Sequence, residues 1–221
     1  MDTTRTKERP ILFSGEMVRV ILAGDKTQTR RVVKPQPTCF IPGAYFDAYN
    51  GGPQWNWWTQ NNRLCNGDTI MKCPYGVPGE RLWVRETWAV HEGADKFAPR
   101  MLHPGWASGD VWFRADDRAP LVSIRDRGKW RPSRYMPRWA SRITLEVTGV
   151  RVERVQDISE ADAKSEGCAQ RRVDRSPGGL TAIEEFAALW ESINAKRGFC
   201  WDVNPWVWVV EFRRLQTTEG A

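Results

Sequence analysis

Apolar and polar residues alternate with a period of two over several segments of the chain, and this pattern predicts a mostly β protein. The clearest case is 81–89, where Leu82, Val84 and Trp88 share one strand face with Glu86. The segment 205–212 is apolar on both faces at its start, which is typical of a buried strand. Further strands are predicted at 10–13, 27–33, 69–73, 111–115 and 143–155.

Helical spacing of apolar residues is confined to three segments. Ser14 is a suitable N-cap and Gly24 a suitable C′ residue for a helix between them. Capping-box patterns begin two more helices, a short one over 159–167 and a longer amphipathic one over 181–194. Because the predicted helices are few among many strands, the fold class is α+β, mostly β.

Three segments follow neither period, at about 34–68, 91–110 and 116–141. The first is rich in Pro, Gly and Trp, and clustered aromatics are atypical of disorder, so we interpret it as an ordered insertion. The simplest architecture is a small, partly open β-barrel with a few flanking helices and irregular, Trp-rich insertions. We expect a single domain over 10–215, with a flexible arm at 1–9 and a flexible tail at 216–221.

Positive charge is concentrated in one segment. The 221 residues include 33 Lys and Arg against 27 Asp and Glu, a net charge of +6. Seven basic residues and one acidic residue lie within 125–142, so this segment alone carries +6. Interleaved aromatic side chains would suit single-stranded RNA or DNA, although a solvated loop is an equally good interpretation. The candidate nucleic-acid-binding residues are Arg131, Arg134, Arg138, Trp130 and Tyr135.

Several classes of protein are disfavoured by what the sequence lacks. It has no apolar leader, and no apolar run approaches the roughly 20 residues that cross a bilayer. Five cysteines without close pairs do not resemble a disulfide framework. The spacing of Cys65, Cys73, His91 and His103 matches no zinc pattern. We expect a cytoplasmic monomer without metal or cofactor.

Glu86 does not fit the strand on which it is predicted to lie. A carboxylate on an otherwise apolar face is costly unless it is paired or protonated. One interpretation is a buried glutamate paired with a structural arginine. The other is a functional acid.

The segment 24–31 places a lysine, two threonines and two arginines on a turn and the strand after it. Such a run is usually a solvated turn. However, Gly24-x-Lys26-x-x-Thr29-x-Arg31 resembles the G-x-K-x-x-T-x-R signature of ASCH domains, which have a PUA-like β-barrel. The Pro-Gly-x-x-Leu-x-Val pattern at 78–84, followed by Glu86, is also similar to that family. The resemblance covers 11–33 and 69–89, with the barrel continuing through 142–155 and 206–212.

The resemblance implies a function. The long, Trp-rich form is similar to ASCH proteins carried by phages and prophages, which would act in the cytoplasm of a bacterial host. Small ASCH enzymes are N4-acetylcytidine amidohydrolases, and by position Lys26 resembles their proton acceptor, Thr29 the nucleophile and Glu86 the proton donor. The implied ligand is a modified pyrimidine nucleoside or nucleotide. Other ASCH proteins bind RNA or cleave it, so a non-catalytic nucleic-acid-binding module and a ribonuclease remain open.

The residue types make that chemistry feasible under two conditions. Lys26 is a base only when neutral, so burial or a nearby cation such as Arg30 or Arg31 must lower its pKa. Lys26 must also lie in the turn before the strand, because alternation would otherwise point it away from Thr29. We predict that Lys26, Thr29 and Glu86 converge on one pocket, with a Lys26–Glu86 ion pair at rest.

Four further residues are candidates for substrate binding. Arg31 shares the predicted strand face of Thr29, where it would orient a carbonyl or a phosphate, and a salt bridge at the barrel rim is the alternative. Trp88 is predicted to form a pocket wall, although an inward tryptophan is more often part of the core. Thr27 and Arg30 complete this predicted set.

Overall fold

The computed structural model describes residues 6–36, 54–55, 71–103, 111–116, 126–168 and 180–216. Most of the predicted insertion 34–68, with Cys65, lies outside these residues. The chain divides into two compact units, which are described separately. The first unit comprises Met1–Gly24, Arg81–Glu146 and Arg214–Ala221, and the second comprises Asp25–Glu80 and Val147–Arg213.

Five strands form the main sheet, hydrogen-bonded in the order β1-β5-β8-β9-β2. Within the described residues β1 and β2 are its edges, and no pairing closes the sheet into a barrel. β1 pairs with β5 in parallel, whereas β5 with β8 and β2 with β9 are antiparallel. The mixed α+β class with a few helices is therefore confirmed. The strands are β1 (Glu8–Leu12), β2 (Gln28–Val32), β5 (Arg81–Arg85), β8 (Thr144–Arg154) and β9 (Trp206–Leu215).

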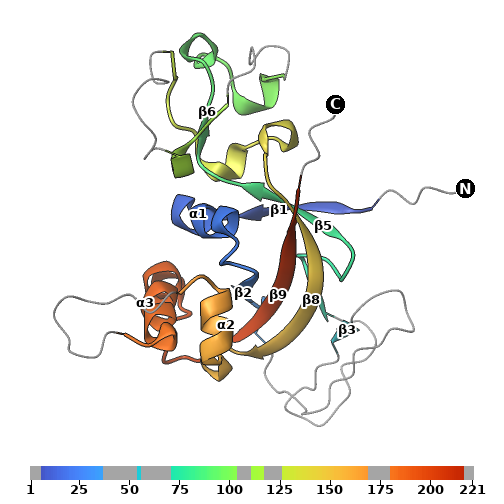
Figure 1. The fold of residues 1–221 in the computed structure, drawn as a ribbon, viewed down its shortest axis with the longest axis vertical. Helices are drawn as coiled ribbons and strands as arrows, with labels where there is room; N and C mark the ends of the chain where they lie inside the picture. The colour runs from blue at the N-terminus through green and yellow to red at the C-terminus, as the bar shows by residue number, and fades with distance from the viewer. Residues whose placement is uncertain are drawn as a thin grey trace, which may run out of the picture. The chain divides into compact units, whose positions relative to one another are not determined.

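The first unit contains helix α1 (Gly15–Ala23) beside β1 (Figure 1). Its caps follow the prediction: the Ser14 side chain accepts from the Met17 amide at 3.3 Å, and Gly24 adopts a left-handed φ of 90°. β1 begins at Glu8, two residues earlier than predicted. The single strand expected at 81–89 is wrong, because it divides into β5 and β6 (Trp88–Ala89).

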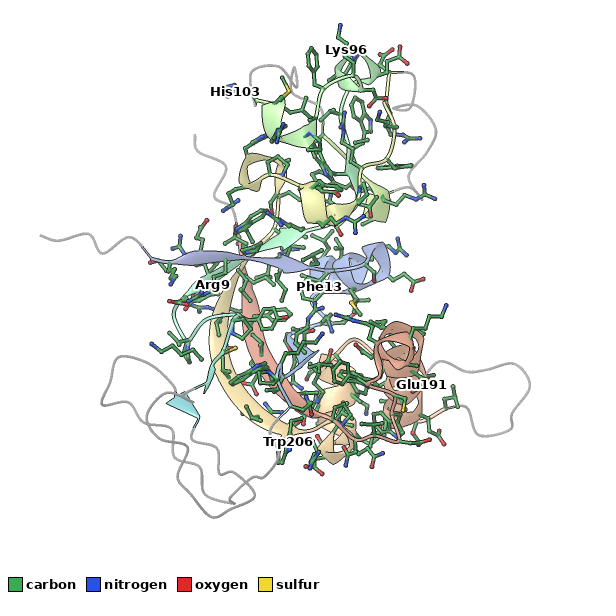
Figure 2. The ribbon with its side chains drawn as sticks, turned by 180° about the vertical axis from the view of Figure 1, so that it is seen from behind. Arg9, Phe13, Lys96, His103, Glu191 and Trp206 are labelled. Atoms are coloured by element: carbon green, nitrogen blue, oxygen red, sulfur yellow. The ribbon has the colours of Figure 1, made fainter. Side chains whose placement is uncertain are left out.

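The segment after β6 packs into the core of the first unit. β6 pairs with β7 (Trp112–Phe113), and short 3-10 turns supply most of the remaining structure. Trp88, Val90, Leu102 and Met136 are buried together, and Figure 2 shows the side chains around the labelled Lys96 and His103. The 3-10 turns are η2 (Glu92–Ala94), η3 (Pro99–Met101), η5 (Arg114–Asp116), η7 (Ser133–Tyr135) and η8 (Arg138–Ala140).

The second unit packs helices α2 (Glu160–Ser165) and α3 (Ala182–Asn194) side by side (Figure 1). Both begin as predicted: Ser159 accepts from the Asp162 amide, and Thr181 forms a reciprocal capping box with Glu184. Phe186 and Trp190 of α3 pack in one buried cluster with residues of β9. Figure 2 labels Trp206 at the start of β9. The short elements are β3 (Gln54–Trp55), β4 (Met71–Lys72), η9 (Val155–Asp157) and η10 (Ala195–Arg197).

None of the described helices combines the length and apolar character that crossing a bilayer requires.

Candidate functional site

The turn before β2 is anchored on both sides within the second unit. The Thr27 amide donates to the Ser165 carbonyl at 2.9 Å, and the Thr27 carbonyl accepts from the Phe212 amide at 2.8 Å. Thr27 itself is exposed, whereas Lys26 is only 2% exposed and Thr29 only 3%. The interpretation of this segment as a solvated turn is therefore wrong for its reactive side chains. Lys26 lies outside β2, as the sequence predicted.

Lys26 is held by a carboxylate that the sequence did not indicate. Its Nζ donates to the Glu166 Oε2 at 2.6 Å and to the Glu166 backbone carbonyl at 2.7 Å. Glu166 is only 5% exposed and caps the C-terminus of α2. Burial lowers the pKa of Lys26, Glu166 opposes this shift, and nearby Arg31 adds to it. The net direction is downward, which favours the neutral amine required of a base.

Arg30, on β2, also binds the Glu166 carboxylate. Its guanidinium pairs with Glu166 at 3.5 Å, with Asp162 at 3.4 Å and with Glu153. Arg151 extends the network by contacting Glu153 and Asp162, at 3.0 and 3.1 Å. Each buried charge here has a counter-charge, the condition under which burial of ions is tolerated.

The two faces of β2 separate its side chains into two groups. Gln28 and Arg30 share one face, and Thr29 and Arg31 share the other. Burial lowers the pKa of Arg31, which also interacts electrostatically with Tyr75 and Glu166. Arg31 therefore lies near Tyr75 and near Glu166, the carboxylate that binds Lys26.

Glu86 belongs to the first unit and is paired with an arginine. It is only 1% exposed and accepts from Arg142 Nε at 3.0 Å and Nη2 at 3.2 Å. Arg142 also binds both Asp116 oxygens, at 2.7 and 3.0 Å, and its guanidinium lies 3.9 Å from the Phe113 ring centre. Burial raises the pKa of Glu86 and Arg142 opposes this shift. Of the two interpretations of Glu86, the structure shows the arginine pair.

The predicted catalytic residues are divided between the units. Lys26 and Thr29 belong to the second unit, and Glu86 to the first. The carboxylate found on Lys26 is Glu166, in place of the predicted Glu86 partner. Convergence of the three residues on one pocket stays a prediction.

Trp88 belongs to the core of its unit. It is fully buried, and its ring meets Trp139 edge-on at a centroid distance of 6.1 Å. The Arg131 guanidinium lies 5.9 Å from the same ring. These contacts are those of a packed core tryptophan, the alternative considered from the sequence.

The predicted nucleic-acid-binding residues fall into two groups. Arg131 is buried, and its guanidinium donates to the carbonyls of Ala94 and Phe97 at 3.0 and 3.2 Å, which ties down that loop. Arg138 is exposed but pairs with Glu8 at 2.8 Å. The other three take part in cation–π contacts. The guanidinium groups of Arg114 and Arg127 lie over the Trp130 ring, and exposed Arg134 lies over the ring of exposed Tyr135.

Across the described ranges, no group of three or more His, Cys, Asp or Glu is arranged to bind a metal ion.

Comparison with known proteins gives little. No family model matches the chain, and no curated protein matches it. Among solved structures the chain is similar to the crystal structure of an ASCH domain from Lactobacillus crispatus JV V101, with 12% identity over 90% of this chain and 70% of that one. The TM-score is 0.36, which supports no inference about this protein.

Proposed function

We propose that the protein hydrolyses the amide bond of an N4-acylated cytidine or a related modified pyrimidine nucleoside or nucleotide. The observations that carry the proposal are a buried lysine with a lowered pKa in the turn before β2 and a buried threonine on β2, at positions that resemble the ASCH signature. Both side chains are buried, and the downward shift of the Lys26 pKa is the direction that a general base requires.

The proposed roles require a neutral Lys26 and a protonated Glu86, and burial shifts the pKa of each residue in that direction. Neutral Lys26 accepts the Thr29 hydroxyl proton as the oxygen attacks the acyl carbonyl carbon. The bond to N4 then breaks, and the leaving amine takes a proton from Glu86 as cytidine departs. Water attacks the resulting acyl ester and gives its proton to Glu86, and Lys26 returns its proton to Thr29 as the carboxylic acid leaves.

Glu166 and Arg31 support these roles from within the second unit. Glu166 fixes the Lys26 amine through two hydrogen bonds, which removes the rotamer freedom of a long side chain. Arg31 contributes to the lowered pKa of Lys26 and shares the strand face of Thr29. Its guanidinium is suited to orient the acyl carbonyl.

The test is release of cytidine from N4-acetylcytidine. We expect turnover by the wild-type protein and its loss in Lys26→Met and in Thr29→Val, each checked for folding by circular dichroism. Lys164→Ala is the matched control, because Lys164 is an exposed lysine on α2 in the same unit. Wild-type protein without turnover, or full turnover in Lys26→Met, would overturn the proposal.

A second candidate function is binding of single-stranded RNA or DNA, and exposed Arg134 beside exposed Tyr135 favours it. Binding through phosphate contacts weakens as salt rises, because counterions are released. A fluorescence anisotropy titration of an oligonucleotide at several salt concentrations measures this slope. A flat salt response would exclude this candidate.

A further inference from the structure

A cavity of about 380 Å³ lies in the first unit, where η3 and η7 meet the end of β5. This volume is within the range of small-molecule sites. Its lining residues come from three separate segments, so the cavity depends on the tertiary fold. Those used below are Arg85, Pro99, Arg100, Arg134, Tyr135 and Pro137.

The cavity is strongly positive. Among the described residues, its lining includes three arginines and no acidic residue. Among the described residues neither Arg100 nor Arg134 forms an ion pair, whereas the neighbouring Arg138 and Arg142 are both bound by carboxylates. Unneutralised arginines that converge on a cavity suit an anion, above all a phosphate that can accept several N–H donors.

One of the three arginines is fixed in place. The Arg85 guanidinium lies 4.5 Å from the Trp83 ring centre, and its Nη1 donates to the Arg134 carbonyl at 3.1 Å. Its Nε is buried without a hydrogen-bond partner. The stacked and hydrogen-bonded guanidinium therefore needs little further ordering when an anion binds.

The rest of the lining offers an aromatic face and rigid walls. Tyr135 is 54% exposed, which is high for an aromatic residue. Pro99 and Pro137 restrict the backbone on either side. Met136, the residue between Tyr135 and Pro137, is fully buried in the core of the unit, so the Tyr135 segment is anchored. A base that stacks on Tyr135 would find it already ordered.

We infer that this cavity binds one nucleotide unit, with its phosphate on the three arginines and its base against Tyr135. The inference rests on the second proposed function and names its binding site. A free nucleotide and the end of a nucleic-acid strand share this chemistry.

The test is equilibrium binding by calorimetry or by ligand-detected NMR. The probes are cytidine 5′-monophosphate, cytidine, inorganic phosphate and a short single-stranded oligonucleotide with and without a 5′-phosphate. The variants are Arg100→Gln and Tyr135→Ala, whose exposed side chains can be removed without unfolding the core. Lys96→Gln is the matched control, because Lys96 is an exposed cation of the same unit outside the cavity lining.

We expect the monophosphate to bind more tightly than cytidine or phosphate alone, and each variant to weaken it about tenfold or more while Lys96→Gln does not. Competition by the 5′-phosphorylated strand, and not by the unphosphorylated one, would identify a strand end as the ligand. No competition by either strand would identify the free nucleotide.

Monophosphate binding that is absent, or unchanged in both variants, would overturn the inference. If an oligonucleotide binds the wild type and both variants equally, the protein binds nucleic acid as the second proposed function states, but this cavity is not the binding site. If no probe binds, both fail.

Discussion

Glu166 and Glu86 are both buried carboxylates, yet the cations that hold them differ in kind. Glu166 is shared by Lys26 and Arg30, whose side chains are fully buried. Among the described residues Glu86 is bound by Arg142, through a two-point contact, and that arginine side chain is 28% exposed. An amine can lose its proton under physiological conditions and a guanidinium cannot. The Glu166 cluster therefore contains a cation that can lose its proton, whereas the cation of the Glu86 cluster stays charged.

The largest expected effect is on the Glu166 cluster. Glu166→Ala leaves Lys26 and Arg30 buried with less counter-charge, and breaking a buried pair in this way costs about 3–5 kcal/mol of unfolding free energy. Chemical denaturation measures the change. Asp202→Ala, at an exposed turn of the same unit, should change it little. Equal effects of the two substitutions would mean that the buried network contributes no more to the unfolding free energy than an exposed carboxylate does.

Local signals predicted the helices well. Ser14, Gly24 and the capping box at Thr181 each act on the backbone within four residues, so the sequence contains the whole interaction. The strand at 81–89 was predicted from alternation alone. It breaks after Arg85 because Trp88 pairs with Phe113 and Arg131, and these remote partners leave no trace in the local pattern.

The same limit applies to the candidate site. The sequence indicates Lys26 as a base whose pKa must be lowered by burial or by a nearby cation, but it does not indicate Glu166, which lies 140 positions away and outside any periodic pattern. A buried lysine requires a counter-charge, so the existence of such a partner could be predicted and its position could not. The sequence marks Glu86 as anomalous for the same reason, but it does not distinguish its partner Arg142 from the other arginines of the basic segment.

The Glu86 cluster should respond less to loss of its carboxylate charge. Glu86→Gln keeps the shape and one acceptor, and Arg142 retains Asp116, so we expect a loss of about 1–3 kcal/mol. Asp116→Asn, which removes the exposed partner of the same arginine, should cost no more than about 1 kcal/mol. Cytidine release by Glu86→Gln decides the role of the residue. Unchanged turnover in a destabilised variant would make Glu86 structural only.

The lowered pKa of Lys26 predicts that the unfolding free energies of the wild-type protein and of Lys26→Met depend differently on pH. The pKa of Lys26 is lower in the folded state than in the unfolded chain, so the unfolded state binds more protons between those two values. Unfolding free energy should therefore rise with pH across that window, by at most about 1.4 kcal/mol per pH unit for one group. Lys26→Met should remove this contribution. Denaturation of both proteins from pH 7 to 10 gives the two slopes, and equal slopes would contradict a depressed lysine.

The smallest effect concerns the aromatic ring beside each arginine. The Arg142 guanidinium lies 3.9 Å from the Phe113 ring centre, and Arg30 lies 5.7 Å from that of Phe186. Because cation–π attraction falls with distance, a double-mutant cycle with Phe→Leu and Arg→Met should give a coupling of about 0.5–1 kcal/mol for the first pair and less for the second. Phe186 is a core residue, so its substitution alone costs more packing energy than that of Phe113. The double-mutant cycle subtracts this packing cost. A larger coupling at Phe186 would mean that Arg30 depends on its ring as well as on its carboxylates, and the contrast between the two clusters would then rest on the lysine alone.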